Sequence, residues 1–396
     1  MKIAFFTVLI LECGGGLEKY FIETASKLAK MPSVKTDVVT MDDKFTINIV
    51  RLLHIFYMSF TTKIDKKLIY KENTRSIRNN LGDARYFKVN SIANLRKKMQ
   101  EYDLIYCKNE VLEAFVLKFL VGYKNLPPVI FGCHTPFYYP YAASLQSKLH
   151  NFLYNSFVYK FLASNARAFH VINAYDEKHL KKLLPEKKIA RIYNPLDNHD
   201  CVKLSKKYKF SFKWDKTRFN ILWAARLTEQ KGVPELLWLI DYLNSNGYKD
   251  RVVFNIVGDG SEKLREDIKK SARKWDNVNF FGHVQFKYMS NIYSNNDLFI
   301  STSRWESFGL SLLEAQSFGL AAVSFDIPGS QDIILDKKTG FLVNEKDEFA
   351  KKIITILLNP KIFKSNTIKK VIQDKFNPKK IYNQLWKTFL ELNNNQ

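Results

Sequence analysis

The sequence predicts two α/β domains, each built from a parallel β-sheet with helices on both faces. Three observations support this fold class. The chain has 396 residues, which is too long for one ordinary hydrophobic core. Short apolar runs rich in β-branched residues alternate with amphipathic stretches of helical period. This alternation lapses once, between about Cys201 and Thr217, and then restarts.

The first half of the chain begins with an apolar stretch that leads into the glycine loop Gly14–Gly16. A signal peptide would start similarly, but Glu12 breaks the small-residue pattern of a cleavage site, so a buried strand is favoured. The amphipathic stretch Leu17–Ala29 is expected to be the helix that follows. The expected strands of this half are Ile3–Ile10, Thr36–Thr40, Leu104–Cys107, Val129–Gly132 and Ala168–Ile172.

The second half repeats the alternation. Its expected strands are Phe219–Ala224, Val252–Val257, Val278–Phe281, Leu298–Ser301 and Ala321–Phe325. Its expected helices are Pro234–Asn244, Glu262–Lys274, Tyr288–Ser294, one that runs through Glu314, and a last one at about Pro378–Leu392. We therefore expect domains at residues 1–200 and 201–375 and a separate C-terminal helix within 376–396.

The net charge of +23 is the strongest compositional feature. Residues 44–98 hold 13 Lys and Arg against 3 Asp and Glu, with aromatic and aliphatic residues between them. This stretch is either a solvated lysine-rich face or a surface for anionic lipid or an acidic partner, and composition leaves both open. The chain has no zinc-finger, basic-zipper or aromatic ribonucleoprotein motif, so we expect no nucleic-acid partner.

Hydropathy and cysteine content together predict the cellular compartment of the protein. No apolar run approaches the ~20 residues that a membrane-spanning helix needs. The four cysteines lack the spacing of a metal site and the density of a disulfide framework, which predicts reduced thiols. These features predict a cytoplasmic protein, held at the inner face of the membrane if residues 44–98 bind lipid.

Candidate functional residues follow the expected strands, because open α/β sheets bind ligands outside the carboxyl ends of their strands. Glycines 14–16 precede a helix whose N-terminus attracts anions, although a tight turn also explains them. His134 follows Val129–Gly132 and is either a structural hydrogen-bonding group or a functional one. Arg226 and Lys231 bracket the next domain's first loop, and both side chains suit phosphate. Lys231 lies at a helix N-terminus, which disfavours a cation without an anionic partner.

The stretch RWESFGLSLLE contains two glutamates, Glu306 and Glu314. Within one helix they would lie about 80° apart around the axis and would not share a face. With Glu306 in the preceding loop and Phe308–Gly309 at the helix start, both carboxylates could hold one elongated ligand, and the helix amides could face an anion.

In order along the chain, the stretches ARLTEQKG, VGDGSE, FFGHV and ESFGLSLLEAQSFGLAAVSFD resemble the family 4 glycosyltransferases of the GT-B fold. GGGLEKYFIETASKLAK resembles that family's glycine–glycine–x–glutamate helix start. The resemblance covers nearly the whole chain. It implies two Rossmann-like αβα domains that face each other across a cleft, the first for the acceptor and the second for a nucleotide-sugar. It also implies that the C-terminal helix crosses back to the first domain.

The resemblance further implies retaining transfer of a sugar from a UDP- or GDP-sugar to a glycan or lipid-linked acceptor, in the biosynthesis of surface polysaccharide, lipopolysaccharide or glycolipid. Glu306 and His134 would act at the donor sugar. Arg226 and Lys231 would bind the diphosphate, and Glu314 the ribose. The remaining implied donor-binding residues are Gly15, Gly16, Gly258, His283, Val284, Phe308, Gly309 and Leu310. No Asp-x-Asp sequence occurs, so neither a metal nor another cofactor is expected.

Two other functions remain open on the sequence. One is a nucleotide-sugar 2-epimerase on the same fold, which would need hydrolysis and re-addition chemistry and carries different motifs. The other is a basic protein that binds membrane or nucleic acid without activity. The presence together of Glu306, Glu314, Arg226 and Lys231 disfavours an inactive protein.

Overall fold

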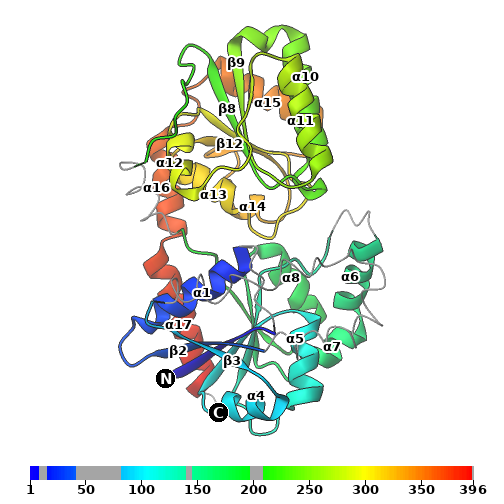
Figure 1. Cartoon of the computed structure of the whole chain (residues 1–396), viewed down its shortest axis with the longest axis vertical. Helices are drawn as coiled ribbons and strands as arrows, with labels where there is room; N and C mark the ends of the chain where they lie inside the picture. Colours follow the sequence, from blue (N-terminus) through cyan, green and yellow to red (C-terminus); the bar gives the residue numbers. More distant parts are fainter. Residues whose placement is uncertain (9–15, 42–81, 140–144, 197–207, 395–396) are drawn as a thin grey trace. The chain divides into compact units, whose positions relative to one another are not determined.

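A computed structural model of the chain describes residues 1–8, 16–41, 82–139, 145–196 and 208–394. The chain divides into two compact units (Figure 1). Unit 1 consists of Met1–Asn194 and Lys379–Gln396, and unit 2 of Pro195–Pro378. The division therefore falls at Asn194, against residue 200 in the sequence-based expectation, and the C-terminal helix belongs to unit 1.

Unit 1 is built on a seven-stranded sheet in the order β3-β2-β1-β4-β5-β6-β7. All of its strand pairs are parallel. The strands are β1 (Lys2–Phe6), β2 (Lys35–Met41), β3 (Arg85–Val89), β4 (Leu104–Lys108), β5 (Val129–Cys133), β6 (Ala168–Val171) and β7 (Lys188–Arg191). The two strands of this sheet that the sequence did not predict, β3 and β7, lie at its edges and are the least buried.

Helices cover both faces of this sheet. They are α1 (Gly16–Ala29), α4 (Ile92–Met99), α5 (Val111–Phe115), the π-helical η1 (Val116–Val121), α6 (Leu145–Asn155), α7 (Phe157–Ala163), α8 (Ala174–Leu183) and α17 (Pro378–Asn394). On one face, Phe21 of α1 packs on Phe5, and Phe389 of α17 packs on Tyr106, with ring centroids 5.9 and 5.5 Å apart. The opposite face, which includes Phe6, packs against α4, α5, α7 and α8.

Unit 2 has a six-stranded parallel sheet in the order β10-β9-β8-β11-β12-β13. Its strands are β8 (Phe219–Ala224), β9 (Val252–Val257), β10 (Val278–Phe280), β11 (Leu298–Ser301), β12 (Ala321–Phe325) and β13 (Gly340–Val343). Its helices are η2 (Glu229–Lys231), α10 (Val233–Leu243), η3 (Asn244–Tyr248), η4 (Lys249–Arg251), α11 (Glu262–Lys274), α12 (Phe286–Ser294), α13 (Leu310–Ser317), α14 (Ser330–Ile333), α15 (Lys346–Leu358) and α16 (Ser365–Lys375). Strand β9 is buried along its whole length, as in parallel sheets covered on both faces.

Helix α17 carries a stripe of buried apolar side chains against unit 1. Ile381, Leu385 and Phe389 recur every four residues, so they share one face of the helix. On its exposed side, Glu391 forms an ion pair with Lys188 of β7 at 2.7 Å. The last helix of the chain therefore completes the first domain, where it covers one face of the sheet.

The basic stretch at residues 44–98 is described only in part, because residues 44–81 lie outside the described residues. Its remainder forms β3 and α4. The expectation that this stretch meets an anionic membrane therefore stays a prediction. None of the helices in the described ranges is long and apolar enough to cross a membrane.

Candidate active site

The strand order of each sheet reverses once, and open α/β sheets bind ligands at the carboxyl ends of the strands on either side of that point. In unit 2 the reversal lies between β8 and β11. The loops that follow these two strands are residues 225–232 and 302–309, and they contain Arg226, Lys231 and Glu306. The strand order thus brings two separate sequence motifs to one edge of the sheet.

The two loops are tied together through Thr302. Its hydroxyl donates to the carbonyl of Lys231 at 2.9 Å and accepts from the indole Nε1 of Trp223 at 2.9 Å. Gly232 has a left-handed φ of 66°, and a Cβ on it would lie 1.9 Å from the carbonyl oxygen of Thr302. Only glycine permits this approach, because any side chain would push the loops apart.

Lys231 and Glu306 form an ion pair at this junction, from Nζ to Oε1. The hydroxyl of Ser303 donates to the same carboxylate oxygen at 3.0 Å. Both charged side chains are only 15% exposed, so the pair is largely shielded from water. Glu306 is therefore the anionic partner that Lys231 needs at the start of α10, and the pair joins two residues that the resemblance assigns to different parts of a ligand.

The loops after β9 and β10 lie beside the loop that holds Arg226. The amide of Leu227 donates to the carbonyl of Asp259, and the amide of Gly258 donates to that of Gly282, both at 2.9 Å. Gly258 has a φ of 152°, and a Cβ on it would lie 1.9 Å from the carbonyl oxygen of Ala225. Gly258 is therefore required for packing between loops, a role that accompanies the ligand contact implied by the resemblance.

These loops also carry the candidate donor-binding residues Arg226, His283 and Val284. Arg226 is exposed, and it has no ion pair with another residue of the described ranges. His283 is exposed and Val284 is half-buried, both just beyond β10. Hydrogen bonds from Arg265 and then from the Gly260 amide lower the pKa of Asp259 in the neighbouring loop.

Helix α13 supplies the other predicted residues. It starts at Leu310, and Gly309 is its N-cap with a left-handed φ of 93°. Phe308 is 3% exposed, and its ring packs on Phe376 with centroids 5.7 Å apart, so its side chain is part of the core. Glu314 is held by Tyr293, whose hydroxyl donates to Oε2 at 2.8 Å.

In unit 1, Gly15 lies outside the described residues, and Gly16 is the first residue of α1.

His134 follows β5 and joins a buried chain of hydrogen bonds. Its Nε2 lies 3.0 Å from the hydroxyl of Tyr106, which lies 2.7 Å from Nδ1 of His170. Nε2 of His170 lies 2.7 Å from the carbonyl oxygen of Ile192.

This chain determines the tautomer of His134. A carbonyl only accepts, so Nε2 of His170 carries the proton, and its Nδ1 accepts from Tyr106. The Tyr106 oxygen then accepts from Nε2–H of His134, which leaves Nδ1 of His134 as an acceptor. Burial lowers the pKa of His170 to about 4. Burial first, and then the nearby His170, lower the pKa of His134 well below its usual value. His134 is therefore a neutral group that can accept a hydrogen bond from a hydroxyl.

Glu113 of α5 is a further buried polar residue, and it contacts the residues that follow β1. It is 3% exposed and accepts hydrogen bonds from the hydroxyl of Thr7 at 3.0 Å and from the amide of Val8 at 3.1 Å. Burial raises the pKa of its carboxyl group. The contact anchors the carboxyl end of β1, from which the chain enters the glycine-rich stretch.

Sequence reasoning missed several residues that position the site. Ser303 could have been suspected as a polar residue beyond a strand's carboxyl end. Tyr106, His170 and Tyr293 gave no such signal, because their partners belong to other strands or helices and become neighbours only in the folded chain. In the described part of the chain, no group of three or more His, Cys, Asp or Glu could hold a metal ion.

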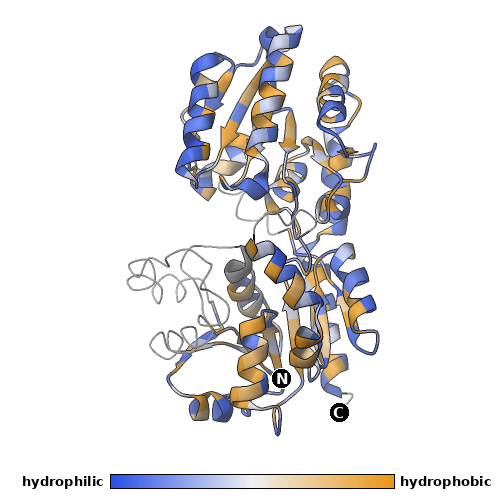
Figure 2. Cartoon of the chain, turned by 90° about the vertical axis from the view of Figure 1, so that its right-hand side faces the viewer, coloured by the Kyte–Doolittle hydropathy of each residue, from blue (hydrophilic) through white to orange (hydrophobic). Residues whose placement is uncertain are grey.

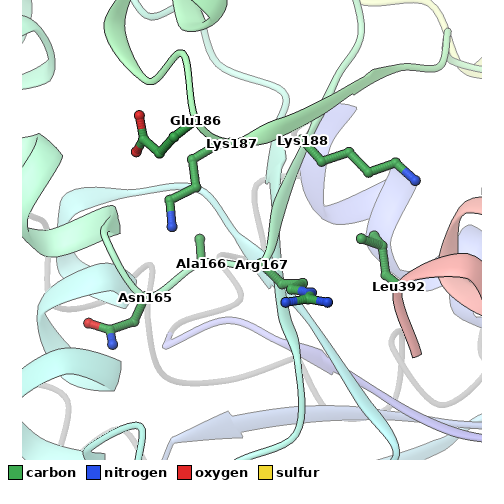
Figure 3. A pocket seen from close by; sticks show the side chains of 7 residues that line it. All are labelled: Asn165, Ala166, Arg167, Glu186, Lys187, Lys188 and Leu392. Carbon is green, nitrogen blue, oxygen red and sulfur yellow. The ribbon is translucent and has the colours of Figure 1, made fainter. Parts of the chain in front are cut away.

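A pocket of about 420 Å³ lies elsewhere in unit 1 (Figure 3). It is lined by Asn165, Ala166, Arg167, Glu186, Lys187, Lys188 and Leu392. These residues precede or begin β6 and β7, except for Leu392 of α17. The pocket is therefore at the amino ends of the strands, opposite the edge where α/β sheets bind their ligands, and it is separate from the candidate active site.

Comparison with known proteins defines the class to which this fold and site belong. A family model described as Glycosyltransferase Family 4 matches residues 14–199. A second, described as Glycosyl transferases group 1, matches residues 205–374. The two models together match most of the chain, which is therefore similar to GT-B glycosyltransferases of family 4.

Solved structures confirm the fold. Sucrose-phosphate synthase from Thermosynechococcus elongatus matches with a TM-score of 0.73 over 100% of both chains, at 17% identity. Anabaena HepE in complex with UDP and glucose matches with a TM-score of 0.68 over 99% of this chain and 100% of that one, at 19% identity.

Curated relatives match over parts of their length. An uncharacterized 41.2 kDa protein in the cps region of Klebsiella pneumoniae is 33% identical over 44% of this chain and 46% of its own. The GtfA subunit of a UDP-N-acetylglucosamine–peptide N-acetylglucosaminyltransferase of Streptococcus pneumoniae is 31% identical over 32% of this chain and 24% of its own. The O-antigen biosynthesis glycosyltransferase WclY of Escherichia coli is 23% identical over 76% of this chain and 85% of its own. The chain thus spans less than half of the first two relatives.

Proposed function

We propose that the protein transfers a sugar, with retention of configuration, from a UDP- or GDP-sugar to a glycan or lipid-linked acceptor. The observation that carries this proposal is the shielded Lys231–Glu306 pair at the point where the strand order of unit 2 reverses. A ligand with a diphosphate and a sugar offers each member of the pair a new partner of suitable chemistry. Lysine would meet phosphate oxygens, and the carboxylate would accept from sugar hydroxyls.

The chemistry follows from the charges that form as the glycosyl–phosphate bond breaks. Negative charge grows on the leaving diphosphate, and fixed cations beside it lower the barrier because they need no reorganisation. Lys231 and Arg226 are the proposed cations. Glu306, released from Lys231, would hold the donor sugar near the anomeric carbon. The proposal requires no metal, and the leaving phosphate would accept the acceptor's proton.

The proposed roles of the other residues agree with their surroundings. Glu314, oriented by Tyr293, would accept from the ribose hydroxyls, and two acceptor oxygens suit a vicinal diol. His283 and Val284 would border the base. His134, neutral with Nδ1 as its acceptor nitrogen and Asn194 beside it, suits a sugar hydroxyl better than a phosphate.

The relatives favour an acceptor in surface polysaccharide biosynthesis. WclY is described as an enzyme of O-antigen biosynthesis, and the Klebsiella pneumoniae relative lies in a cps region. HepE was solved with UDP and glucose, which supports a UDP-sugar as the first donor to test.

The experiment is a donor-panel assay with radiolabelled UDP- and GDP-sugars, with and without EDTA, and with lipid-linked and oligosaccharide acceptors. We expect transfer or slow donor hydrolysis with one donor, unchanged by EDTA, and NMR of the product should show a retained anomeric configuration. Absence of both turnover and nucleotide binding with every donor would refute the proposal. Inversion would refute the retaining mechanism, and release of a 2-epimerised free sugar would identify an epimerase instead.

A further inference from the structure

The outer surface of unit 1 exposes four phenylalanines that take no part in the core. Phe119, Phe152, Phe157 and Phe161 are 55%, 68%, 80% and 52% exposed. The rings of Phe119 and Phe161 lie 6.0 Å apart, and Phe157 precedes Phe161 by one helical turn, so these three share one side. Single exposed apolar residues are ordinary, whereas a group on adjacent helices marks a contact surface.

The four rings come from helices that lie side by side. They belong to η1, α6 and α7, and Figure 1 shows α6 and α7 together at one side of unit 1. Figure 2, turned so that this side faces the viewer, shows apolar stretches on the helices of unit 1. These helices face outward from the layer that covers the sheet, so the core cannot bury their outer rings.

The helices of this surface carry only basic charged residues, and the carboxylate of Glu186 lies beside Lys187 at its edge. Residues 114–175 contain five Lys and Arg and no Asp or Glu. Lys148 lies one turn from Phe152 on α6, and Lys160 directly precedes Phe161 on α7. Nζ of Lys118 lies 4.2 Å from the centroid of the Phe161 ring. Basic and aromatic side chains are therefore interleaved on η1, α6 and α7, and these three helices contain no carboxylate.

Two of the lysines are held beside each other at the end of α7. Lys118 donates to the Ser164 hydroxyl at 2.7 Å, and Lys187 donates to the Ser164 carbonyl at 2.5 Å. Lys118 donates in addition to the side-chain oxygen of Asn165 at 2.6 Å, and Asn165 and Lys187 line the same pocket (Figure 3). Burial, and then the charge of Lys187, lower the pKa of Lys118. Neither lysine has an ion pair with a described carboxylate, so an external anion would relieve their repulsion.

We propose that this surface, the outer patch, binds the interfacial region of an anionic phospholipid bilayer. Its members are Phe119, Phe152, Phe157, Phe161, Lys118, Lys148, Lys160 and Lys187. Phenylalanines that enter the headgroup boundary lose contact with water, while lysines beside them meet lipid phosphates. This surface shares no residue with the predicted contact at residues 44–98, and the proposal stands independently of the transfer reaction.

Other occupants fit the patch less well. Lysine is depleted from the centres of protein–protein interfaces, yet here it alternates with the aromatic rings. A symmetric dimer through the patch would set its own lysines against each other. A bilayer of anionic lipid satisfies the apolar and the cationic residues together.

The first test is co-sedimentation of the full chain with vesicles of equal parts phosphatidylglycerol and phosphatidylcholine, or of phosphatidylcholine alone. We expect binding to the anionic vesicles, weakened but not abolished by salt. Each of Phe152→Ser, Phe157→Ser and Phe161→Ser should lower the partition coefficient roughly tenfold, and Lys148→Gln and Lys160→Gln about fivefold each. The matched control is Leu358→Ser with Ile362→Ser, which are 54% and 46% exposed in unit 2 and should change nothing. Unchanged binding by the triple phenylalanine variant would overturn the proposal.

The second test distinguishes lipid from other occupants. In Phe157→Trp, emission should shift to the blue, and brominated lipids should quench it, only when anionic vesicles are added. A blue-shifted, acrylamide-protected tryptophan without lipid would show that another part of the chain covers the patch. A dimer that Phe157→Ser dissociates, or a protein partner that outcompetes vesicles, would likewise overturn lipid binding. Donor hydrolysis measured in parallel without vesicles should be unchanged in all these variants, which separates this proposal from the proposed function.

Discussion

Lys231 and Glu306 neutralise each other in a shielded position where the strand order of unit 2 reverses, and Ser303 donates to the same carboxylate oxygen. This contact joins two loops that are about 75 residues apart in the sequence. Because breaking a shielded pair leaves one uncompensated charge, a ligand that separates them must supply a partner for each. A nucleotide-sugar does this, whereas an anion alone would satisfy only the lysine.

The pair should behave as a unit in kinetics. Lys231→Met and Glu306→Gln should each lower kcat/KM by about 10²-fold or more. The double variant should lose much less than the product of the two losses, because each single change already disables the other residue. The control is Lys249→Met, which removes another lysine–carboxylate pair of unit 2, with Asp276 at 3.1 Å, and should leave kcat/KM unchanged. Fully multiplicative losses would contradict the coupling.

Tyr293 should contribute to nucleotide affinity without touching the nucleotide. Tyr293→Phe removes the hydrogen bond that orients Glu314. Because a hydrogen bond to a charged group contributes more free energy than one between neutral groups, its loss should raise the Kd for UDP roughly tenfold. Isothermal titration calorimetry measures this change. Tyr242→Phe, on an outward ring stacked on Trp238, is the control. An unchanged Kd in Tyr293→Phe would mean that Glu314 is oriented by other contacts or does not bind the ribose.

The close approach at Gly232 should be visible in stability. Gly232→Ala and Gly247→Ala both place alanine at a positive φ, 66° and 85°, but only the first meets a backbone oxygen at 1.9 Å. Both should lose about 1 kcal/mol from the backbone conformation, and Gly232→Ala about 2 kcal/mol more from the clash. Urea unfolding compares them. Equal losses would show that the loops can separate freely, and nucleotide binding by Gly232→Ala would then be retained.

His170 should make stability depend on pH below neutrality. Burial lowers its folded-state pKa to about 4, below the ordinary value of 6.5, so the unfolded chain takes up the proton first. Its contribution is fully present above pH 6.5 and is lost as the pH falls toward 4, by up to about 3 kcal/mol. Urea unfolding across this range should show a steeper fall for the wild type than for His170→Asn. His283→Asn, at an exposed position, should follow the wild type, and parallel slopes for all three proteins would contradict a buried neutral His170.

Much of the fold follows from local patterns. Strands β8, β9, β11 and β12 have the predicted bounds, because buried parallel strands are continuous apolar runs ended by glycine or polar residues. Strands β3, β7 and β13 were missed, and all three are short edge strands, of which β3 and β7 carry charge while β13 carries none. Helices α6 and α7 were also not predicted, since their outer faces carry phenylalanines that blur the amphipathic period.

For the candidate site, too, some features follow from the sequence and others only from the tertiary structure. By itself, the sequence determined which residues could bind a charged ligand, because Arg226, Lys231, Glu306 and His134 lie in loops after apolar runs and Glu314 lies inside the helix that follows Glu306. Only the tertiary structure decided which of them meet. The order of parallel strands is a long-range property, so nothing local to Lys231 or Glu306 indicates that β8 and β11 are neighbours. The same holds for the tautomer of His134, which depends on a chain of contacts through Tyr106 and His170 to a backbone carbonyl beyond the next strand.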